Sequence, residues 1–533
     1  MTQERLWQDL DPLWTDPRTL SALLCGSAAA IILLKWLGQR QIQQKMEEAR
    51  RMRDLALERM EKAVCRFKKE NPGAQTAHIL SLPMVELVEK LKEGSLSLES
   101  VLYSYMGKAL EVTQEVNCVI DFIHGCEDQL QKLKKQKEKG LLYGIPISIK
   151  DHINCKGHVS SGGMVKFLGQ VKEEDSVIVQ VLKSQGAIPF VKTNIPQTMI
   201  NYDCSNLIFG QTLNPLNHKK SPGGSSGGEG ALIAGGGSIL GIGSDVAGSI
   251  RLPSSFCGLC GLKPTGDRIS DGISVLAVTG MLGPMARDVE SLALCMKALL
   301  CKEMFRLDPT VPPIPFNEEV YSSSKPLRIG YYEGDGYFQP SPSMRRAVQQ
   351  TRKLLQEAGH TVNIVDPNLK SQFNTYRLPV LVKRILAIIL KPIVSVWTSH
   401  LHHNTVCHLL CLPLQVYCTE FIAKWRKLGL DVILCPALGP AFNHAATSYT
   451  NLYNVLNFPA GVVPVSTVTR ADEEELKHYR GHYGDPWDKR LKEVRAVGLP
   501  VAVQCVALPW QEELCLRFMK EVETLTHGMR RNV

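Results

Sequence analysis

The sequence has few features of a secreted, metal-binding or nucleic-acid-binding protein. Its 16 cysteines are scattered at irregular spacing, which does not predict a disulfide framework and indicates a reducing compartment. Cys257 and Cys260 form a C-x-x-C with no second pair or H-x-x-x-H nearby, so no zinc site is predicted. The net charge of +9 is modest, and no aromatic-plus-basic RNA motif is present. We therefore expect neither a metal nor a nucleic-acid partner.

Short apolar runs alternate with helix-like segments in the C-terminal half of the chain. The expected strands lie at 327–332, 361–365, 432–435, 461–465 and 501–508. An amphipathic helix is expected at 344–358, between the first two. This alternation predicts an α/β fold with a mixed, twisted β-sheet covered by helices.

A run rich in Gly and Ser stands out at 221–253. Of its first ten residues five are Gly and three are Ser, yet apolar residues at 231–234 and 239–242 exclude a linker. The third Gly of a dinucleotide fingerprint is missing, and so is the Gly-Lys-Ser/Thr of a P-loop. G-x-S-x-G matches twice, but no strand leads into it as a nucleophile elbow requires. The remaining chemistry for this run is that of a serine paired with a lysine.

Lys150 is the candidate partner, about 75 residues before the run. Ile145, Ile147 and Ile149 alternate as on a half-buried strand, which places Lys150 at the strand end on the opposite face. A lysine acts as a base only when neutral, so its pKa must fall from about 10.4. A surface lysine closing a strand is the alternative.

Three motifs together resemble the amidase signature family in spacing and order. They are Lys150, the Gly-Gly-Ser-Ser-Gly-Gly of 223–228 and the Ser-Asp-Val-Ala-Gly-Ser-Ile-Arg-Leu-Pro of 244–253. The stretches 258–265, 283–288, 457–461 and 498–504 look like the same family. Within it the resemblance is to members that hydrolyse fatty acid amides, from the N-terminus to residue 523.

The resemblance implies a Ser-Ser-Lys mechanism with no cofactor. Ser249 would be the nucleophile, Lys150 the base and acid, and Ser225 the bridge between them, while Ser226 would hydrogen-bond Lys150. An oxyanion hole is implied at the backbone N–H groups of four consecutive residues, Val246, Ala247, Gly248 and Ser249.

Two residues of this motif depart from the family pattern. Ser244 replaces a Thr, and Ala247 replaces a Gly inside the oxyanion loop. If that position needed φ > 0, the Cβ of Ala247 would cost of order 1 kcal/mol or more and would tilt a donor away.

The nearest motifs of the resemblance assign contact with the acyl chain of the substrate to four residues, Met199, Ile200, Tyr202 and Leu252. Ile200 and Leu252 replace aromatics but still favour a hydrocarbon, at roughly 0.8 kcal/mol for each buried CH₂. Packing in the core is the alternative for all four. The stretches 268–282 and 365–376 are shorter than in the family.

The N-terminal region predicts a membrane anchor and a stalk. The apolar run at 20–34 with its flanks predicts a transmembrane helix at about 20–37, within an anchor at 1–38. A cleaved signal peptide is the alternative, opposed by acidic residues before the run and by Lys35 and Trp36 after it. Basic residues follow the run, which predicts a cytosolic catalytic body. A charged helical stalk is expected at 39–75 and the catalytic domain at 76–533.

Two further segments predict surface contacts. At 376–401 basic residues punctuate apolar ones, as in helices that lie in a membrane interface, and the resemblance identifies this segment as a membrane cap. A buried helix pair is the alternative. Pro312 to Pro315 would suit an SH3-type partner as a polyproline II ligand, with a stiff loop as the alternative.

The sequence therefore predicts a membrane-bound serine amidase that converts fatty acid amides to fatty acid and amine. N-acylethanolamines such as anandamide and primary amides such as oleamide are the implied substrates. A homodimer on endomembranes, in particular the endoplasmic reticulum, is also implied. One alternative is a catalytically impaired lipid-amide-binding paralogue or a truncated isoform, suggested by Ala247 and the short stretches. The other is the glutaminase subunit of an amidotransferase.

Overall fold

A single large sheet organises the body of the protein. The computed structural model describes residues 17–270, 280–336, 338–365, 403–439, 448–480 and 495–531. Within these residues the sheet has 11 strands in the order β1-β3-β2-β6-β8-β7-β12-β13-β11-β9-β10. In chain order they are β1 Val119–Phe122, β2 Pro146–Lys150, β3 Ile188–Thr193, β6 Leu240–Asp245, β7 Cys260–Lys263, β8 Met281–Ala286, β9 Arg328–Tyr331, β10 Thr361–Ile364, β11 Val432–Pro436, β12 Ala460–Thr467 and β13 Pro500–Val506. A separate hairpin pairs β4 Ser205–Asn206 with β5 Gly210–Gln211.

The sheet is mixed, as predicted. Strand β2 runs parallel to both of its neighbours, β3 and β6. The middle of the sheet is antiparallel from β6 through β8, β7 and β12 to β13 and β11. Strands β11, β9 and β10 are again parallel. All five strands expected in the C-terminal half are present.

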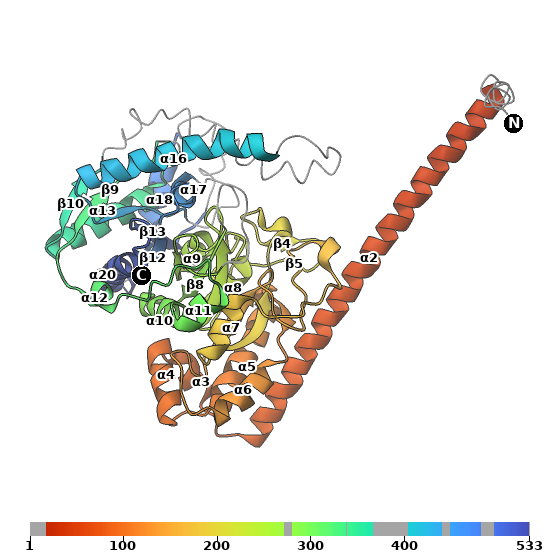
Figure 1. The fold of residues 1–533 in the computed structure, drawn as a ribbon, viewed down its shortest axis with the longest axis horizontal. Coiled ribbons are helices and arrows are strands. Elements are labelled where there is room, and N and C mark those ends of the chain that lie inside the picture. Colours follow the sequence, from red (N-terminus) through yellow and green to blue (C-terminus); the bar gives the residue numbers. More distant parts are fainter. Residues whose placement is uncertain are drawn as a thin grey trace.

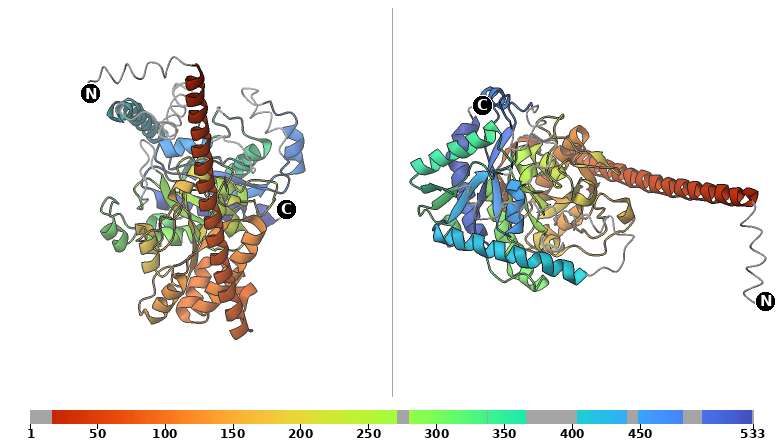
Figure 2. Two further views of the ribbon diagram at one scale, coloured as in Figure 1. Left: turned by 90° about the vertical axis from the view of Figure 1, so that its right-hand side faces the viewer. Right: turned by 90° about the horizontal axis from the view of Figure 1, so that it is seen from above.

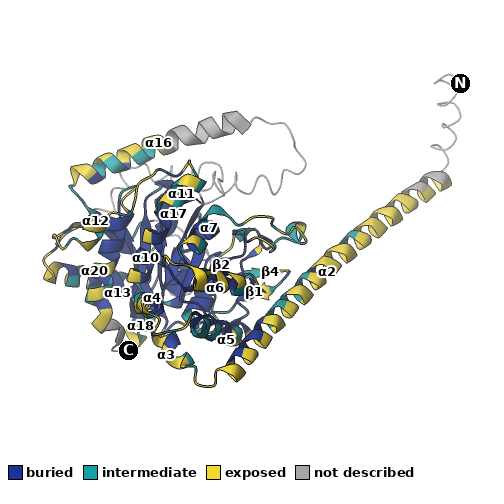
Figure 3. Ribbon diagram, turned by 60° about the horizontal axis from the view of Figure 1, so that its bottom comes forward, coloured by how far each residue is buried: buried dark blue, intermediate teal, exposed yellow. Residues whose placement is uncertain are grey.

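Helices surround the sheet, and most of its strands are buried, whereas the edge strand β10 is largely exposed (Figures 1 and 3). They are α2 Pro17–Glu70, α3 Thr76–Ser81, α4 Met84–Glu93, α5 Leu98–Val116, α6 Cys126–Lys135, α7 Val177–Ser184, α8 Gly227–Ala234, α9 Arg251–Cys257, α10 Val289–Leu299, α11 Lys302–Leu307, α12 Glu318–Ser322, α13 Pro342–Glu357, α16 His403–Lys427, α17 Ser448–Val455, α18 Arg470–Leu476 and α20 Glu512–Arg531, with the short 3₁₀ turns η1 Val165–Phe167 and η2 Gln197–Met199.

Helix α13 shows how the local sequence sets these elements. The side chain of Ser341 accepts a hydrogen bond from the N–H of Met344, and Pro342 occupies the first turn, where its missing N–H costs nothing. Met344, Val348 and Leu355 share one face and are buried. The helix expected at 344–358 is therefore confirmed to within two residues at its start.

Helix α2 leaves the body and extends far beyond it (Figures 1 and 2). Its C-terminal part packs on the body through buried Met60, Val64 and Phe67. Closer to the N-terminus of the helix, the guanidinium of Arg50 donates to the carbonyls of Leu207 and Ile208, at 2.9 and 2.6 Å. The helix runs without a break through the predicted boundary between anchor and stalk at residue 38. The predicted division into anchor, stalk and catalytic domain stays a prediction.

The predicted transmembrane helix at about 20–37 is not found. Among the described residues, no helix combines the length and the apolar character needed to cross a bilayer.

Of the two other predicted surface segments, at 376–401 and at Pro312 to Pro315, only the second lies within the described residues. The predicted cap at 376–401 lies outside the described residues, as do 271–279 and 366–376 from the two shortened stretches. The segment from Pro312 to Pro315 is described, and the carbonyl of its Ile314 accepts a hydrogen bond from the buried Arg268. An SH3-type partner for it stays a prediction.

Candidate active site

Lys150 lies at the end of β2, where its side chain is fully buried. Its Nζ is 2.6 Å from Ser225 Oγ, 2.8 Å from Ser244 Oγ and 3.4 Å from the carbonyl oxygen of Ser244. Burial lowers the pKa of Lys150 from 10.5 to about 7, because an ammonium group loses its hydration there.

These three oxygen partners suit either protonation state of Lys150. An ammonium group has three donors and no acceptor, whereas the neutral amine has two donors and one lone pair. In that state Lys150 donates to the two oxygens of Ser244 and accepts from the hydroxyl of Ser225. The hydroxyl proton of Ser225 then points at the base.

Ser225 also contacts Ser249, so it connects Lys150 with the predicted nucleophile. The backbone N–H of Ser225 donates to Ser249 Oγ at 3.1 Å. This approach depends on Gly224, which has φ +58° and where an added Cβ would lie 2.6 Å from Pro253 Cδ and 3.1 Å from Ser249 Cα. The Gly-rich run therefore lets two backbone segments meet at the serines.

Ser226 does not take the position expected for it. We expected its side chain to hydrogen-bond Lys150, but its hydroxyl donates to the carbonyl of Ser244 and accepts from the N–H of Ser244, both at 3.2 Å. The contact with Lys150 is made instead by Ser244, the residue that replaces a Thr of the family pattern. Ser226 thus ties the Gly-rich run to the end of β6.

The loop at 246–249 follows β6 and leads into α9. Among the described residues, the non-glycine residues with positive φ do not include Ala247. The left-handed conformation is taken by Gly248, at φ +125°. The Cβ of Ala247 therefore imposes none of the backbone strain that the sequence raised as an alternative.

The N–H groups of this loop are not equivalent. Gly248 donates to Asp245 Oδ1 at 2.6 Å, so this predicted oxyanion donor is already engaged. Within the described part of the chain, the N–H groups of Val246, Ala247 and Ser249 donate to no protein acceptor. A role of these N–H groups in an oxyanion hole stays a prediction.

Asp245 owes its ionisation to Arg251, and both side chains are fully buried. The guanidinium donates to the two carboxylate oxygens at 2.9 and 3.0 Å and holds the pKa of Asp245 well below its usual range against the opposing effect of burial. Arg251 also donates to Gln504 Oε1, to Asn454 Oδ1 and to the carbonyl of Thr450.

Sequence reasoning did not single out this network. Asp245 and Arg251 are two charged residues in an otherwise apolar and small-residue motif, which was the available signal. Asn454 and Thr450 lie on α17, about 200 residues further along, and no local pattern links them to the loop.

Glu229 is a fully buried carboxyl group beside Lys150 that the sequence analysis did not consider. Its Oε1 accepts from Thr193 Oγ1 at 2.7 Å, and its Oε2 contacts Ser148 Oγ. Ser148 lies two residues before Lys150 on the same face of β2, and Thr193 is the partner of Lys150 on β3.

The hydroxyl of Ser148 has two acceptors within reach. It contacts Glu229 Oε2 and lies 3.0 Å from Ser238 Oγ, while the hydroxyl of Ser238 donates to the carbonyl of Leu240 at 2.9 Å. Burial raises the pKa of Glu229 to about 7, which favours the neutral acid relative to an ordinary carboxyl group.

The four predicted acyl-chain residues occupy different environments. Leu252 is fully buried, and Tyr202 is half-buried with its hydroxyl 3.4 Å from the carbonyl of Ala247. Met199 is half-buried, with φ +59°, and Ile200 is 43 % exposed. Leu252 and Tyr202 thus lie against the 246–249 loop, and an acyl-binding role for all four stays a prediction.

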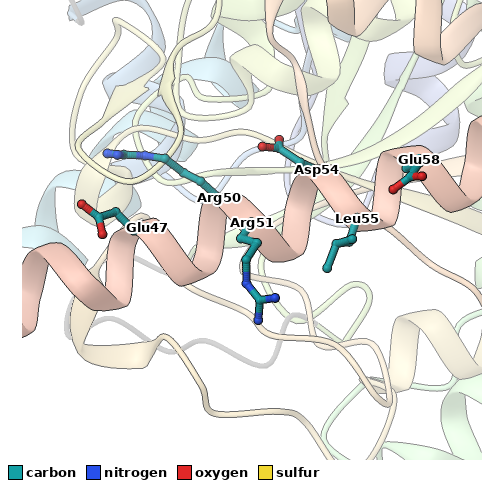
Figure 4. Close-up of a pocket in the computed structure, with 6 residues that line it drawn as sticks. All are labelled: Glu47, Arg50, Arg51, Asp54, Leu55 and Glu58. Carbon is teal, nitrogen blue, oxygen red and sulfur yellow. The ribbon is translucent and has the colours of Figure 1, made fainter.

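A surface cavity of about 400 Å³ lies along α2, lined by Glu47, Arg50, Arg51, Asp54, Leu55 and Glu58 (Figure 4). Its lining contains none of the serines or the lysine described above, and all of it except Arg50 is exposed. Arg50 points toward the body, where it binds the carbonyls next to β4. This cavity is a feature of the helix surface and not of the serine cluster.

Taken together, the buried Lys150, Ser225 and Ser249 have an arrangement that would suit a serine hydrolase with lysine in place of histidine. The profile of the amidase family matches residues 100–382 and 372–516. The chain therefore belongs to the amidase family.

Individual relatives agree with this assignment. The chain is 49% identical to fatty-acid amide hydrolase 1 of Sus scrofa, over 98% of this chain and 99% of the relative. It is 79% identical to the vitamin D3 hydroxylase-associated protein of Gallus gallus, over 74% of this chain and 93% of the relative. A solved structure of a fatty acid amide hydrolase superposes with a TM-score of 0.77 at 25% identity, covering 91% of this chain and 95% of that one.

Proposed function

We propose that this protein hydrolyses fatty acid amides to the free fatty acid and an amine. The observation that carries the proposal is its 49% identity, over nearly the full length of both chains, to a fatty-acid amide hydrolase. The contacts among Lys150, Ser225 and Ser249 support it. N-acylethanolamines and primary amides are the proposed substrates.

In the proposed mechanism Ser249 Oγ attacks the amide carbonyl. Its proton passes to Ser225 Oγ, and the hydroxyl proton of Ser225 passes to the lone pair of Lys150 across the 2.6 Å contact. The carbonyl oxygen becomes an oxyanion that accepts from the N–H groups of Ala247 and Ser249, with Val246 as a further proposed donor. Lys150 then returns the proton to the leaving nitrogen, and the C–N bond breaks.

Water completes the cycle by the same route. It adds to the ester formed on Ser249 and gives its proton to Lys150, and the fatty acid leaves as Ser249 recovers its proton. Lys150 must be neutral when Ser249 attacks the amide and again when water attacks the ester, because it accepts a proton in both steps. The low pKa of about 7 supports this role, because a lysine at its ordinary value would be protonated in the cell.

The function is tested by labelling with a fluorophosphonate and by hydrolysis of oleamide and anandamide. Ser249→Ala should abolish both, and Lys150→Ala should slow both by orders of magnitude. Ser184→Ala, on α7 and outside the cluster, is the matched control and should behave as wild type. A folded wild-type protein that binds oleamide but neither reacts nor hydrolyses would show a binding protein instead. Hydrolysis of glutamine alone would show a glutaminase.

We also propose that the free part of α2 associates with membranes, in keeping with an endomembrane enzyme. Exposed apolar side chains gather along it, namely Leu24, Ile31, Ile32, Leu33, Leu34, Trp36 and Leu37. Such a surface is costly in water and favours an apolar contact. Phosphatidylcholine vesicles should co-sediment with the protein but not with a variant in which Leu33 and Leu34 are Ser.

A homodimer and residence in the endoplasmic reticulum are proposed on the resemblance alone. Sedimentation of the detergent-solubilised protein and imaging of the tagged chain test them. A monomer at every concentration would contradict the dimer.

A further inference from the structure

The peptide between Ala247 and Gly248 is held from both of its polar ends. Its N–H, on Gly248, donates to Asp245 Oδ1 at 2.6 Å. Its carbonyl oxygen, on Ala247, accepts from Thr450 Oγ1 at 2.7 Å and from the more distant hydroxyl of Tyr202 at 3.4 Å. This peptide lies between the N–H groups of Ala247 and Ser249, which donate to no described protein acceptor, so its orientation affects theirs.

Helix α17 supports both ends of the peptide. Thr450 binds the carbonyl directly, and Asn454, one turn later, donates to Asp245 Oδ1 at 2.9 Å. Arg251 joins the two, because it donates to the carbonyl of Thr450 at 3.0 Å and to Asn454 Oδ1 at 2.5 Å. Thr450 is therefore part of a rigid frame and is itself 1% exposed.

The contact between Thr450 and the loop is also close in steric terms. A Cβ at Gly248 would lie 2.6 Å from Thr450 Oγ1, which a real side chain does not tolerate. Thr450 therefore packs closely against Gly248 as well as against the Ala247 carbonyl.

We propose that Thr450 is a positioning residue for hydrolysis, whose hydroxyl fixes the Ala247 carbonyl and so aims the N–H groups of Ala247 and Ser249 at the oxyanion. This rests on the proposed function. Thr450 acts through the loop and has no bond to make or break in the reaction. Its effect should therefore appear where negative charge develops and not in the binding of the neutral amide.

Thr450→Val removes the hydroxyl and keeps the branched shape. Removing an oxyanion donor outright costs about 100- to 1,000-fold in kcat, so losing its orientation should cost about 10- to 100-fold. KM for oleamide should stay within about threefold, since ground-state contacts remain. Thr450→Ser restores the hydroxyl and should recover most of kcat.

Thr351→Val is the matched control. Thr351 is also a fully buried helical threonine whose hydroxyl donates to a backbone carbonyl, that of Ala347, at 2.8 Å. It lies on α13 and contacts no part of the loop. Both valine variants should lose a similar amount of thermal stability, and only Thr450→Val should lose kcat.

A trifluoromethyl ketone of oleic acid adds a second readout, because it adds to the serine as a charged tetrahedral adduct. Its affinity should fall in Thr450→Val by about the same factor as kcat. Equal kcat in the two valine variants, or no recovery in Thr450→Ser, would overturn the proposal. A raised KM at unchanged kcat would make Thr450 a substrate-binding residue instead. An inactive wild-type protein would refute the proposed function itself.

Discussion

Replacing Lys150 by Met should abolish hydrolysis and at the same time stabilise the fold. The lysine is fully buried and has no carboxylate among its hydrogen-bond partners, which are Ser225 and Ser244. Its folded-state pKa is about 7, against 10.5 for the ordinary amine. That difference corresponds to about 5 kcal/mol of unfavourable burial of the charged form.

The direction of the pH dependence of stability follows from the number of protons bound in the folded and unfolded states. Between about pH 7 and pH 10.5 the unfolded chain holds the proton and the folded chain does not, so stability rises with pH across this window. At and below pH 7 the folded protein carries the full cost. Met fills a similar volume without charge and removes this cost. The loss of the lysine's hydrogen bonds destabilises the variant by about 1–3 kcal/mol. A net gain of about 2–4 kcal/mol at pH 7 is expected.

Denaturant titrations at several pH values between about pH 6 and pH 9 measure this gain. The free-energy advantage of Lys150→Met should be largest at the acidic end and should shrink as the pH rises above 7. Lys137→Met, at an exposed position, is the control and should show no such trend. A variant less stable than wild type at pH 7, or an advantage independent of pH, would refute the account of Lys150 as a buried neutral base.

Two further predictions concern the charges around the site. The kcat/KM for oleamide should rise with pH through about 7, because the neutral form of Lys150 is the proposed base, and a flat profile below that pH would contradict this. Asp245→Asn should destabilise the protein by about 3–5 kcal/mol in denaturant titrations, since it leaves the buried guanidinium of Arg251 without its counter-ion. Glu474→Gln, which removes a carboxylate of the exposed pair with Lys477, should have little effect.

Local patterns predicted the strands well, because alternation and apolar runs depend only on neighbouring residues. The isoleucines of β2 placed Lys150 at the strand end and on the face opposite to them, as the structure has it. The transmembrane helix predicted at 20–37 is not found among the helices of the described residues.

The details of the site depend on distant residues and were harder to predict. The family pattern predicted a hydrogen bond between Ser226 and Lys150, whereas the packing of β6 places the hydroxyl of Ser244 next to Lys150. The engagement of Gly248 by Asp245 and the contribution of Thr450 follow from the placement of α17 against the loop, which no periodicity in the chain encodes. A motif names the residues of a site, but the fold decides which of their atoms remain free.

A lysine can serve as a base only if nearby carboxylates do not hold its proton, and three carboxyl groups raise the pKa of Lys150 against the larger effect of burial. Asp151 accepts from Ser161 and from the N–H of Gly162, and Asp245 is paired with Arg251. Glu229 has only hydroxyl partners, and burial raises its pKa to about 7, which favours the protonated acid.

Glu229→Gln tests this last step, because the amide imitates the protonated acid. Its oxygen can accept from Thr193 and its NH₂ can donate to Ser148, so stability and kcat should stay close to wild type. The acid limb of kcat/KM should also stay in place, since no negative charge has been removed beside Lys150. If Glu229 were ionised, its loss would lower the pKa of Lys150 and move the limb to lower pH. Such a shift, measured in a variant that unfolds like wild type, would show that the base works beside a carboxylate after all.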